Sequence, residues 1–284
     1  MAEQVDAMRA SGLTWQHTDA VYVTFLGDDQ GEARLADLVG WSNVSRPHWV
    51  IDERFGSQQE IVPLGPFRRL AALMANRQRD RSQGNKFVPW MRSSELKLVE
   101  HPTLNALYSY CRLNPTHLVW YAHTKGQRNE VCWDSTPRNC SDHWRRYMTH
   151  FVITNGWGNC GVPLSADEAD TCGVNWNDAA PRHYQGNFWW ATCEFINGNE
   201  LPMAQVNVSE PIEDHRMSAE MWLWSARGDM PTFGTHGRLR ARPLCLHSAS
   251  SDENCTGHNL YITPYLPSSY ANASLGKCCV VTER

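Results

Sequence analysis

Four residues that follow a short apolar segment have the chemistry of a phosphate-binding site. Residues 118–122, Leu-Val-Trp-Tyr-Ala, favour a β-strand. The residues that come directly after it are His123, Thr124, Lys125 and Gly126. Lysine supplies a positive charge, threonine a hydroxyl donor, and glycine permits a close approach of the backbone. Since ligands bind beyond the carboxyl ends of strands in open α/β sheets, we expect a phosphate group to bind here.

A second segment has the residue types of a sugar-binding wall. Residues 186–191 read Gly-Asn-Phe-Trp-Trp-Ala. Glycine lets a sugar approach the backbone, and Asn187 offers both a donor and an acceptor to hydroxyl groups. The ring of Trp189 or Trp190 can stack on a sugar. The alternative is the buried start of a helix with core tryptophans, and one of the two is expected to face the core.

The composition argues against two classes of partner. The 284 residues carry a net charge of −4, whereas nucleic-acid-binding domains are usually strongly basic. No segment approaches the roughly 18 apolar residues of a membrane span. The length fits one large α/β domain or two small ones. We therefore expect no nucleic-acid partner and no transmembrane segment in this chain.

The cysteines and glycosylation sequons favour one cellular compartment, and the N-terminal residues favour another. Ten cysteines without a Cys-x-x-Cys pair favour disulfides over a structural zinc site. Sequons, which would make the chain a glycoprotein, begin at Asn43, Asn139, Asn207, Asn254 and Asn272. Together these features favour the secretory-pathway lumen, Golgi-like, with the anchor missing. The N-terminal residues lack the pattern of a signal peptide, which favours the cytoplasm. Both locations stay open.

Apolar periodicity predicts strands and helices that alternate between residues 20 and 200, as in a mostly parallel sheet. We expect a loose lead-in at 1–17, one α/β domain at 18–227, and a loop-rich, cysteine-containing extension at 228–284 that packs on the domain. The expected strands are 20–26, 48–52, 118–122 and 172–176. The expected helices are 32–41, 66–81, 94–111 and 141–155, with a further ordered element at 219–225.

Several motifs occur in an order that resembles a known group of enzymes. They are the strand end at 121–126, Trp144 with Met148 four residues later, and the segment at 186–191. In this order they resemble bacterial, algal and viral sugar transferases that carry a His-Thr-Lys-Gly strand end and a Gly-Asn-Phe-Trp-Trp signature. Gly-Val-Asn-Trp at 173–176 and Glu220 ahead of Met-Trp also fit. The resemblance covers about residues 100–225.

The resemblance implies a GT-A-like fold, which is a single nucleotide-binding α/β domain. It implies a hexosyl- or pentosyltransferase that moves a sugar from a nucleotide-diphosphate donor, its co-substrate, to a hydroxyl of a glycan or glycoconjugate. The donor-binding residues would be Thr24 in the first strand, Asp28 in the loop after it, Thr124 and Gly126. An Asp-rich loop at that place suits a nucleotide and a plain turn equally well.

The chain departs from most GT-A enzymes at the end of the central strand. There, those enzymes carry an Asp-x-Asp motif that holds a divalent metal against the diphosphate. The leaving diphosphate develops negative charge, which a metal or fixed cations and donors must meet. We expect Lys125 to serve as the cation, with His123 and Thr124 as donors and a weak or absent metal requirement. If Mn2+ or Mg2+ is required, Asp28, Asp29 and Asp134 are the first ligands to test.

The acceptor hydroxyl needs a general base if the reaction inverts the configuration of the sugar. The resemblance places this base after the acceptor-side glycine motif, which makes Glu220 the first candidate. Glu194 is the second candidate, and we group it with the acceptor-binding residues. Its alternative interpretation is a helix carboxylate that faces solvent.

Two other functions compete with sugar transfer. The first is a secreted, tryptophan-rich carbohydrate-binding module without catalysis, which the thirteen tryptophans and the sequons favour. The helical content and the lysine at a strand end speak against it. The second is a metal-dependent hydrolase that uses some of the twelve histidines. It ranks lower because the sequence has no His-Glu-x-x-His or His-x-x-x-His pair.

Overall fold

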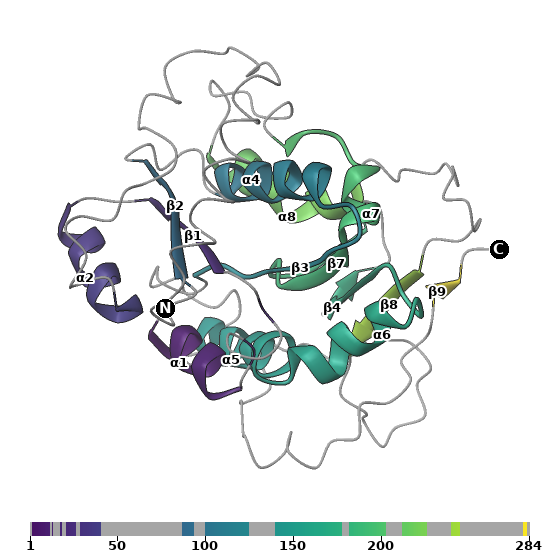
Figure 1. The fold of residues 1–284 in the computed structure, drawn as a ribbon, viewed down its shortest axis with the longest axis horizontal. Helices are drawn as coiled ribbons and strands as arrows, with labels where there is room; N and C mark the ends of the chain where they lie inside the picture. Colours follow the sequence, from purple (N-terminus) through teal and green to yellow (C-terminus); the bar gives the residue numbers. More distant parts are fainter. Residues whose placement is uncertain are drawn as a thin grey trace. The chain divides into compact units, whose positions relative to one another are not determined.

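The computed structural model divides the chain into two compact units (Figure 1). Unit 1 comprises residues 114–200 and 220–284, and unit 2 comprises residues 2–113 and 201–219. The structure describes residues 2–11, 13, 18, 21–26, 29–40, 87–93, 100–124, 140–177, 182–202, 212–225, 240–244 and 281–282. The strand expected at 48–52 and the helix expected at 66–81 lie outside the described residues.

Unit 2 contains a parallel pair of strands and several helices. Strand β1 (Val21–Leu26) pairs with β2 (Phe87–Ser93), and the register shifts between Val23 and Thr24. The strand predicted at 20–26 is thus confirmed, as expected for a run of β-branched and aromatic residues. The helices of this unit are α1 (Ala2–Ala10), α2 (Asp29–Val39), α4 (His101–Leu113) and the first part of α8 (Ile212–Ser225).

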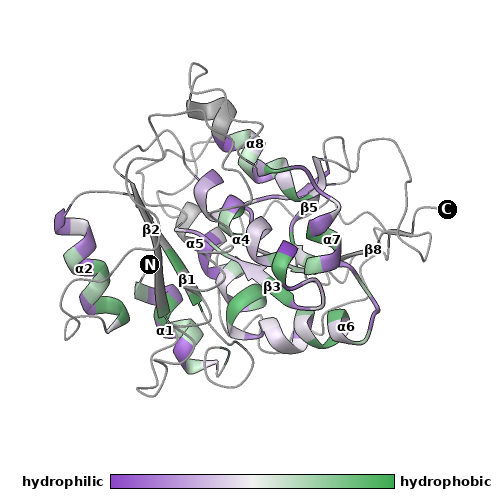
Figure 2. Cartoon of the chain, turned by 45° about the horizontal axis from the view of Figure 1, so that its top comes forward, coloured by the Kyte–Doolittle hydropathy of each residue, from purple (hydrophilic) through white to green (hydrophobic). Residues whose placement is uncertain are grey.

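Helices α1 and α2 bury one side each. Residues 2–10 were expected to be loose, but they form α1 because Val5 and Met8, three apart, both turn inward. Helix α2 has hydrophilic and hydrophobic residues in Figure 2, and its Leu35 and Val39 are buried. The Arg9 guanidinium donates to the Leu38 carbonyl at 2.9 Å, which fixes α1 to α2.

The central sheet of unit 1 is mostly antiparallel, so the predicted GT-A-like domain with a mostly parallel sheet is wrong. The strand order is β3-β7-β4-β8-β9, and one of the four pairings, β4 with β8, is parallel. The strands are β3 (Leu118–Tyr121), β4 (Thr171–Val174), β7 (Trp189–Thr192), β8 (Arg240–Leu244) and β9 (Val281–Thr282).

The connection between β4 and β7 explains the error. Parallel neighbours need a crossover of a dozen or more residues, usually a helix. Here the connecting chain instead forms two short antiparallel strands, β5 (Trp176–Asn177) and β6 (His183–Tyr184), and then a tight turn. Strand β7 therefore returns beside β4 in the opposite direction. The expected strand at 172–176 corresponds to β4 and the start of β5.

Part of the predicted C-terminal extension belongs to the sheet. Strand β8 pairs with β4 in register from Thr171 with Ala241 to Val174 with Leu244, and β9 pairs with β8. Figure 1 shows β8 and β9 on the β4 side of the sheet. The remainder of residues 228–284 lies outside the described residues.

The helix predicted at 141–155 forms at the expected place, but it ends in π-helix. Helix α5 (Cys140–Met148) continues into the π-helical η5 (Thr149–Thr154), which is followed by η6 (Trp157–Gly161) and α6 (Val162–Ser165). π-Helical turns are rare in proteins, and those that do occur are often found at functional sites.

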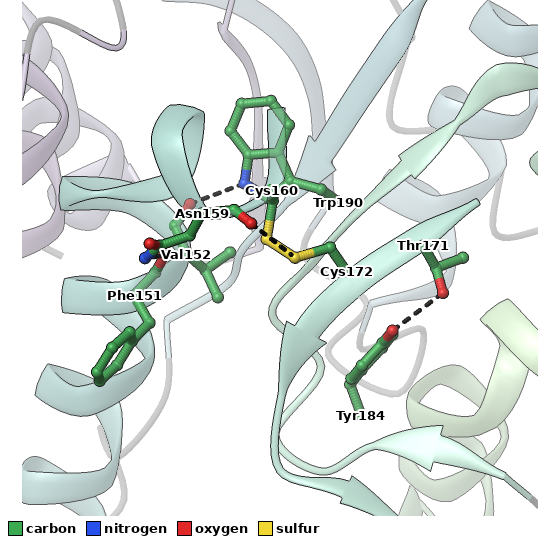
Figure 3. Close-up of a disulfide and its surroundings, with 8 residues drawn as sticks. All are labelled: Phe151, Val152, Asn159, Cys160, Thr171, Cys172, Tyr184 and Trp190. Carbon is green, nitrogen blue, oxygen red and sulfur yellow. Dashed lines mark hydrogen bonds between the residues drawn. A yellow bond between two sulfur atoms is a disulfide. The ribbon is translucent and has the colours of Figure 1, made fainter. Parts of the chain in front are cut away.

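Side chains from the sheet and from the next turn bind carbonyls of η5 (Figure 3). The Trp190 indole donates to the Val152 carbonyl at 2.8 Å, and the Asn159 amide donates to the Phe151 carbonyl at 3.0 Å. A disulfide between Cys160 and Cys172 joins η6 to β4, which agrees with the prediction of disulfides. Cys111 and Cys193 are disulfide-bonded as well. Covalent and polar contacts therefore fix the π-helical segments to the sheet.

Aromatic side chains dominate the core of unit 1. Trp189 stacks on Tyr121 at a centroid distance of 5.3 Å, and Trp176 packs against Tyr184 and Trp224 at 5.0 Å each. The buried aromatic residues of this unit include Trp144, Tyr147, Phe151, Phe188, Trp190, Phe195 and Trp222. In the described part of the chain, no helix combines the length and the apolar character that crossing a membrane requires.

Removal of the Cys160–Cys172 disulfide should destabilise unit 1. The two cysteines are 12 residues apart, and closing a loop of this size stabilises a protein by about 2–4 kcal/mol. The C160A/C172A variant should therefore unfold at lower denaturant concentration under oxidising conditions. Equilibrium denaturation measures the change, and peptide mapping without reductant checks the pairing in the wild type. An unchanged unfolding midpoint would contradict the structural role given to this bond.

Candidate functional site

The candidate site is built around a tight turn that precedes β7. The Asn187 N–H donates to the Tyr184 carbonyl at 3.0 Å, which closes the turn over Gln185 and Gly186. Gly186 has a φ of +88°, whereas the φ of Gln185 is negative. This combination defines a type II turn, in which the third position strongly favours glycine.

Gly186 also has no room for a side chain. A Cβ at this position would lie 2.5 Å from Met148 Sδ and 2.7 Å from Trp144 Cζ2. Trp144 and Met148 are one helical turn apart on α5, so both reach the same spot. The structure thus brings the tryptophan–methionine pair of the sequence motifs against the glycine of another motif.

His123 binds the carbonyl side of Gly186. Its Nε2 lies 2.9 Å from the Gly186 carbonyl oxygen. Because a carbonyl oxygen only accepts, Nε2 must carry the proton of this hydrogen bond. The imidazole stacks on Tyr121 at 6.1 Å and meets the edge of Phe188 at 5.4 Å, which orients the ring.

Glu220 binds the amide side of the same glycine. Its Oε1 accepts a hydrogen bond from the Gly186 N–H. The C-terminal part of α8 that carries Glu220 is anchored in unit 1, because the Trp222 indole donates to the Glu200 carbonyl at 2.9 Å and the Asn199 amide donates to the Leu223 carbonyl at 2.8 Å. Glu220 itself remains partly exposed. A histidine and a carboxylate from distant parts of the sequence therefore meet at one residue.

Asn187, Trp189 and Trp190 are core residues, so their predicted contacts with a sugar do not fit this structure. Their exposed fractions are 1%, 1% and 2%. Asn187 accepts the Trp189 indole N–H at 2.6 Å, and Trp190 donates to the helical carbonyl described above. Both tryptophans face the core, although we expected one to remain available. The segment is a strand, not the start of a helix, and its tryptophans position the turn.

The remaining predicted residues lie in different places. Thr124 follows His123 directly and is partly exposed. Glu194 is exposed in the first turn of α7 (Cys193–Asn197), a helix capped by the Thr192 hydroxyl, which fits the interpretation as a solvent-facing carboxylate. In unit 2, Thr24 lies on β1 and Asp29 begins α2. Outside the described residues are Asp28, Lys125, Gly126 and Asp134.

No metal site is evident in the part of the site that the structure describes. Among the described residues, no group of three or more His, Cys, Asp and Glu side chains is arranged to hold a metal ion. Two of the three aspartates proposed as ligands lie outside these residues.

Sequence reasoning missed that Gly186 itself connects the candidate residues. The available signal was the pair Gln185-Gly186 between two short strands, since glycine is favoured where a type II turn needs positive φ. The partners of the glycine, His123 and Glu220, give no local signal, because they reach it only after folding.

His150 lies on η5. Partial burial lowers the pKa of His150 below its usual 6.5, because burial penalises the charged imidazolium. Its Nε2 lies 3.2 Å from the Asn155 amide nitrogen, and its ring meets the edge of Phe151. The neutral form therefore suits this environment.

Comparison with known families places part of the chain in a known domain family. Residues 72–226 match a family model described as a domain of unknown function (DUF8361). No curated protein and no solved structure matches the chain. The matched region contains His123, Gly186 and Glu220, so the whole turn with both of its partners lies inside the family domain.

Replacement of Gly186 by alanine should strongly destabilise the protein. The positive φ and the contacts of the new Cβ with Met148 and Trp144 together should cost about 2–5 kcal/mol. Thermal and chemical unfolding measure the loss. The matched control is G158A, since no atom lies within 4 Å of a Cβ at Gly158, and alanine there should change stability by no more than about 1 kcal/mol. Equal effects of the two variants would contradict the geometry of the turn.

The lowered pKa of His150 should make stability depend on pH. Between this lowered value and 6.5 the unfolded chain binds more protons than the folded chain, so stability falls as the pH drops through this window. The H150Q variant should lose less stability than the wild type between about pH 7.5 and 5.5. The control is H117Q, because the His117 side chain is exposed. If the stability of the wild type and of H150Q changed equally with pH, the lowered pKa of His150 would be disproved.

Proposed function

Since the chain belongs to the DUF8361 family, whose function is unknown, we propose from its own residues that it is a glycosyltransferase. The enzyme moves a hexosyl or pentosyl group from a nucleotide-diphosphate donor to a hydroxyl of a glycan or glycoconjugate. Its co-substrate is the nucleotide sugar.

One observation carries this proposal. The strand end with His123 and Thr124, the Gly186 turn and Glu220 belong to three separate motifs of the sugar transferases that the sequence resembles. In the structure, the Gly186 amide and carbonyl bind Glu220 and His123, so all three motifs meet within unit 1. A shared site requires that these motifs meet in space, and their contacts at Gly186 support the proposal.

Glu220 has the features of a general base in this reaction. Its Oε1 is held by the Gly186 N–H, and no second hydrogen bond to the carboxylate is present among the described residues. Oε2 is therefore left to take the proton of the acceptor hydroxyl. The acceptor oxygen then forms a bond to the anomeric carbon of the donor sugar, while the bond from that carbon to the diphosphate oxygen breaks.

The leaving diphosphate is stabilised from the strand end. The partly exposed Thr124 offers a hydroxyl donor, and Lys125, next in sequence, offers a positive charge. We assign these two residues and Gly126 to the diphosphate, with a weak or absent requirement for Mn2+ or Mg2+. Lysine at this place supplies charge without the geometry of a metal site.

Tryptophan burial favours an enzyme over a carbohydrate-binding module. Binding modules stack sugars on exposed aromatic rings, whereas none of the eight tryptophans whose burial the structure describes is exposed. Most of them are buried against one another or against other rings. Core packing therefore explains most of the tryptophans whose burial the structure describes.

Turnover of a nucleotide sugar by matched carboxylate variants tests the proposal. A panel of UDP-, GDP- and dTDP-sugars is first screened by thermal shift, because a bound donor raises the unfolding temperature. Release of the nucleotide is then measured with the stabilising donor. E220Q keeps an oxygen for the Gly186 N–H but cannot take a proton, so turnover should fall about 10²- to 10⁴-fold.

The parallel variant E194Q changes the second candidate carboxylate. Glu194 is exposed on a short helix, so this variant should turn over the donor at the wild-type rate. Unchanged turnover in E220Q, or a loss confined to E194Q, would remove Glu220 as the base. Failure of every donor to bind or react would overturn the transferase proposal.

A further inference from the structure

Gly186 is held through two different peptide groups. The peptide before it carries the N–H that binds Glu220, and the peptide after it carries the carbonyl that binds His123. The second peptide also carries the Asn187 N–H that closes the turn on Tyr184. His123 and Tyr184 therefore hold the two ends of one peptide group.

We infer that His123 is a positioning residue, which keeps the turn closed so that the Gly186 N–H stays aimed at Glu220. This inference rests on the proposed role of Glu220 as the base of a sugar transfer. It gives His123 a role different from that of a phosphate ligand, because the Nε2 proton is already used by the Gly186 carbonyl.

The turn needs such support because glycine adopts either sign of φ readily. Type I and type II turns differ mainly by a flip of their central peptide, which is here the peptide between Gln185 and Gly186. In the type II form the Gly186 N–H points at the carboxylate of Glu220. In the type I form the Gln185 carbonyl would take its place, and two oxygens would face each other. The position of Glu220 thus depends on the conformation of this turn.

The surroundings of His123 fit a fixed donor. The ring is stacked on Tyr121, which is 3% exposed, and its edge contact is with Phe188, which is fully buried. Tyr121 is in turn stacked on Trp189. These rings leave the imidazole little freedom to rotate, so its Nε2–H keeps its direction toward the Gly186 carbonyl.

A fixed carboxylate matters because misplacement of a reacting group by about 1 Å can reduce a rate about 100-fold. The Gly186 N–H holds Oε1, and this restricts the positions that Oε2 can take. Loss of the His123 hydrogen bond should therefore lower kcat while the KM for the donor changes little, since Thr124 and Lys125 are untouched.

Two variants of His123 distinguish the effect of its hydrogen-bond donor from the effect of its aromatic ring. H123F keeps an aromatic ring against Tyr121 and Phe188 but has no donor. H123Q loses the ring, but its amide nitrogen reaches about as far as the imidazole Nε2. Hydrogen exchange of the Gly186 amide, measured by NMR without any substrate, reports whether the turn stays closed. The kcat and KM for the donor are then measured in the same variants.

The expected results are specific to each variant. In H123F the Gly186 amide should exchange about 3- to 10-fold faster than in the wild type, as expected for the loss of one net hydrogen bond, and kcat should fall. H123Q should restore slow exchange and most of kcat. The inference would be overturned if the Gly186 amide exchanged at the wild-type rate in H123F. It would also be overturned if H123F, and not H123Q, kept slow exchange and most of kcat. Loss of kcat in both variants with slow exchange would also overturn it, because His123 would then act on the substrate itself.

The exchange measurement separates this inference from the proposed function. If no nucleotide sugar reacts but the Gly186 amide follows the predicted order of exchange, the transferase proposal fails while the support of the turn by His123 stands. If the donor reacts and E220Q is inactive, yet exchange is the same in all His123 variants, the positioning role fails while the transferase proposal stands.

Discussion

The arrangement of the site depends on one backbone constraint, the positive φ of Gly186 in a place without room for a side chain. The +88° φ aims the amide of this residue at Glu220 and its carbonyl at His123. Met148 and Trp144 fill the space in which any other residue would carry its Cβ. A tight turn, a helix and the side chains of His123 and Glu220 are therefore all fitted to the same glycine.

The rest of unit 1 holds the partners of that glycine in place. Trp190 fixes η5, the π-helical extension of α5, to the sheet, and the Cys160–Cys172 disulfide fixes η6. Helix α5 carries Trp144 and Met148. Indole N–H groups need acceptors when buried, and the core supplies a helical carbonyl, the Asn187 amide oxygen and the Glu200 carbonyl for three of them. Trp190 and Trp222 thus fill the core and bind backbone carbonyls at once, and Trp189 binds the side chain of the turn.

Local patterns in the sequence predicted the elements better than their arrangement. β1, β3 and α5 were correctly placed, because runs of β-branched residues and apolar spacings of three and four are local signals. The relative direction of the strands was predicted wrongly. It depends on whether the chain between β4 and β7 forms a helix or a short hairpin. The helix α1 was also missed, since only two of its buried residues are apolar and well spaced.

The sequence suggested candidate residues for the site but not the contacts between them. The residue types of His123 and Glu220 marked them as chemical groups, and the motif order marked Gly186. Burial decided the roles of the others: Trp189 and Trp190 carry the same sequence signal whether they face a sugar or the core. Long-range hydrogen bonds such as those of Gly186 depend on the fold and leave no pattern in neighbouring residues.

A crystal structure of the protein at a resolution that defines individual peptide planes tests the central claim most directly. It should show Gly186 with a φ near +90°, the Glu220 carboxylate on its amide and the His123 Nε2 on its carbonyl. A negative φ at Gly186, with the Gln185 carbonyl turned toward Glu220 or the carboxylate turned away, would contradict the claim that this turn organises the site.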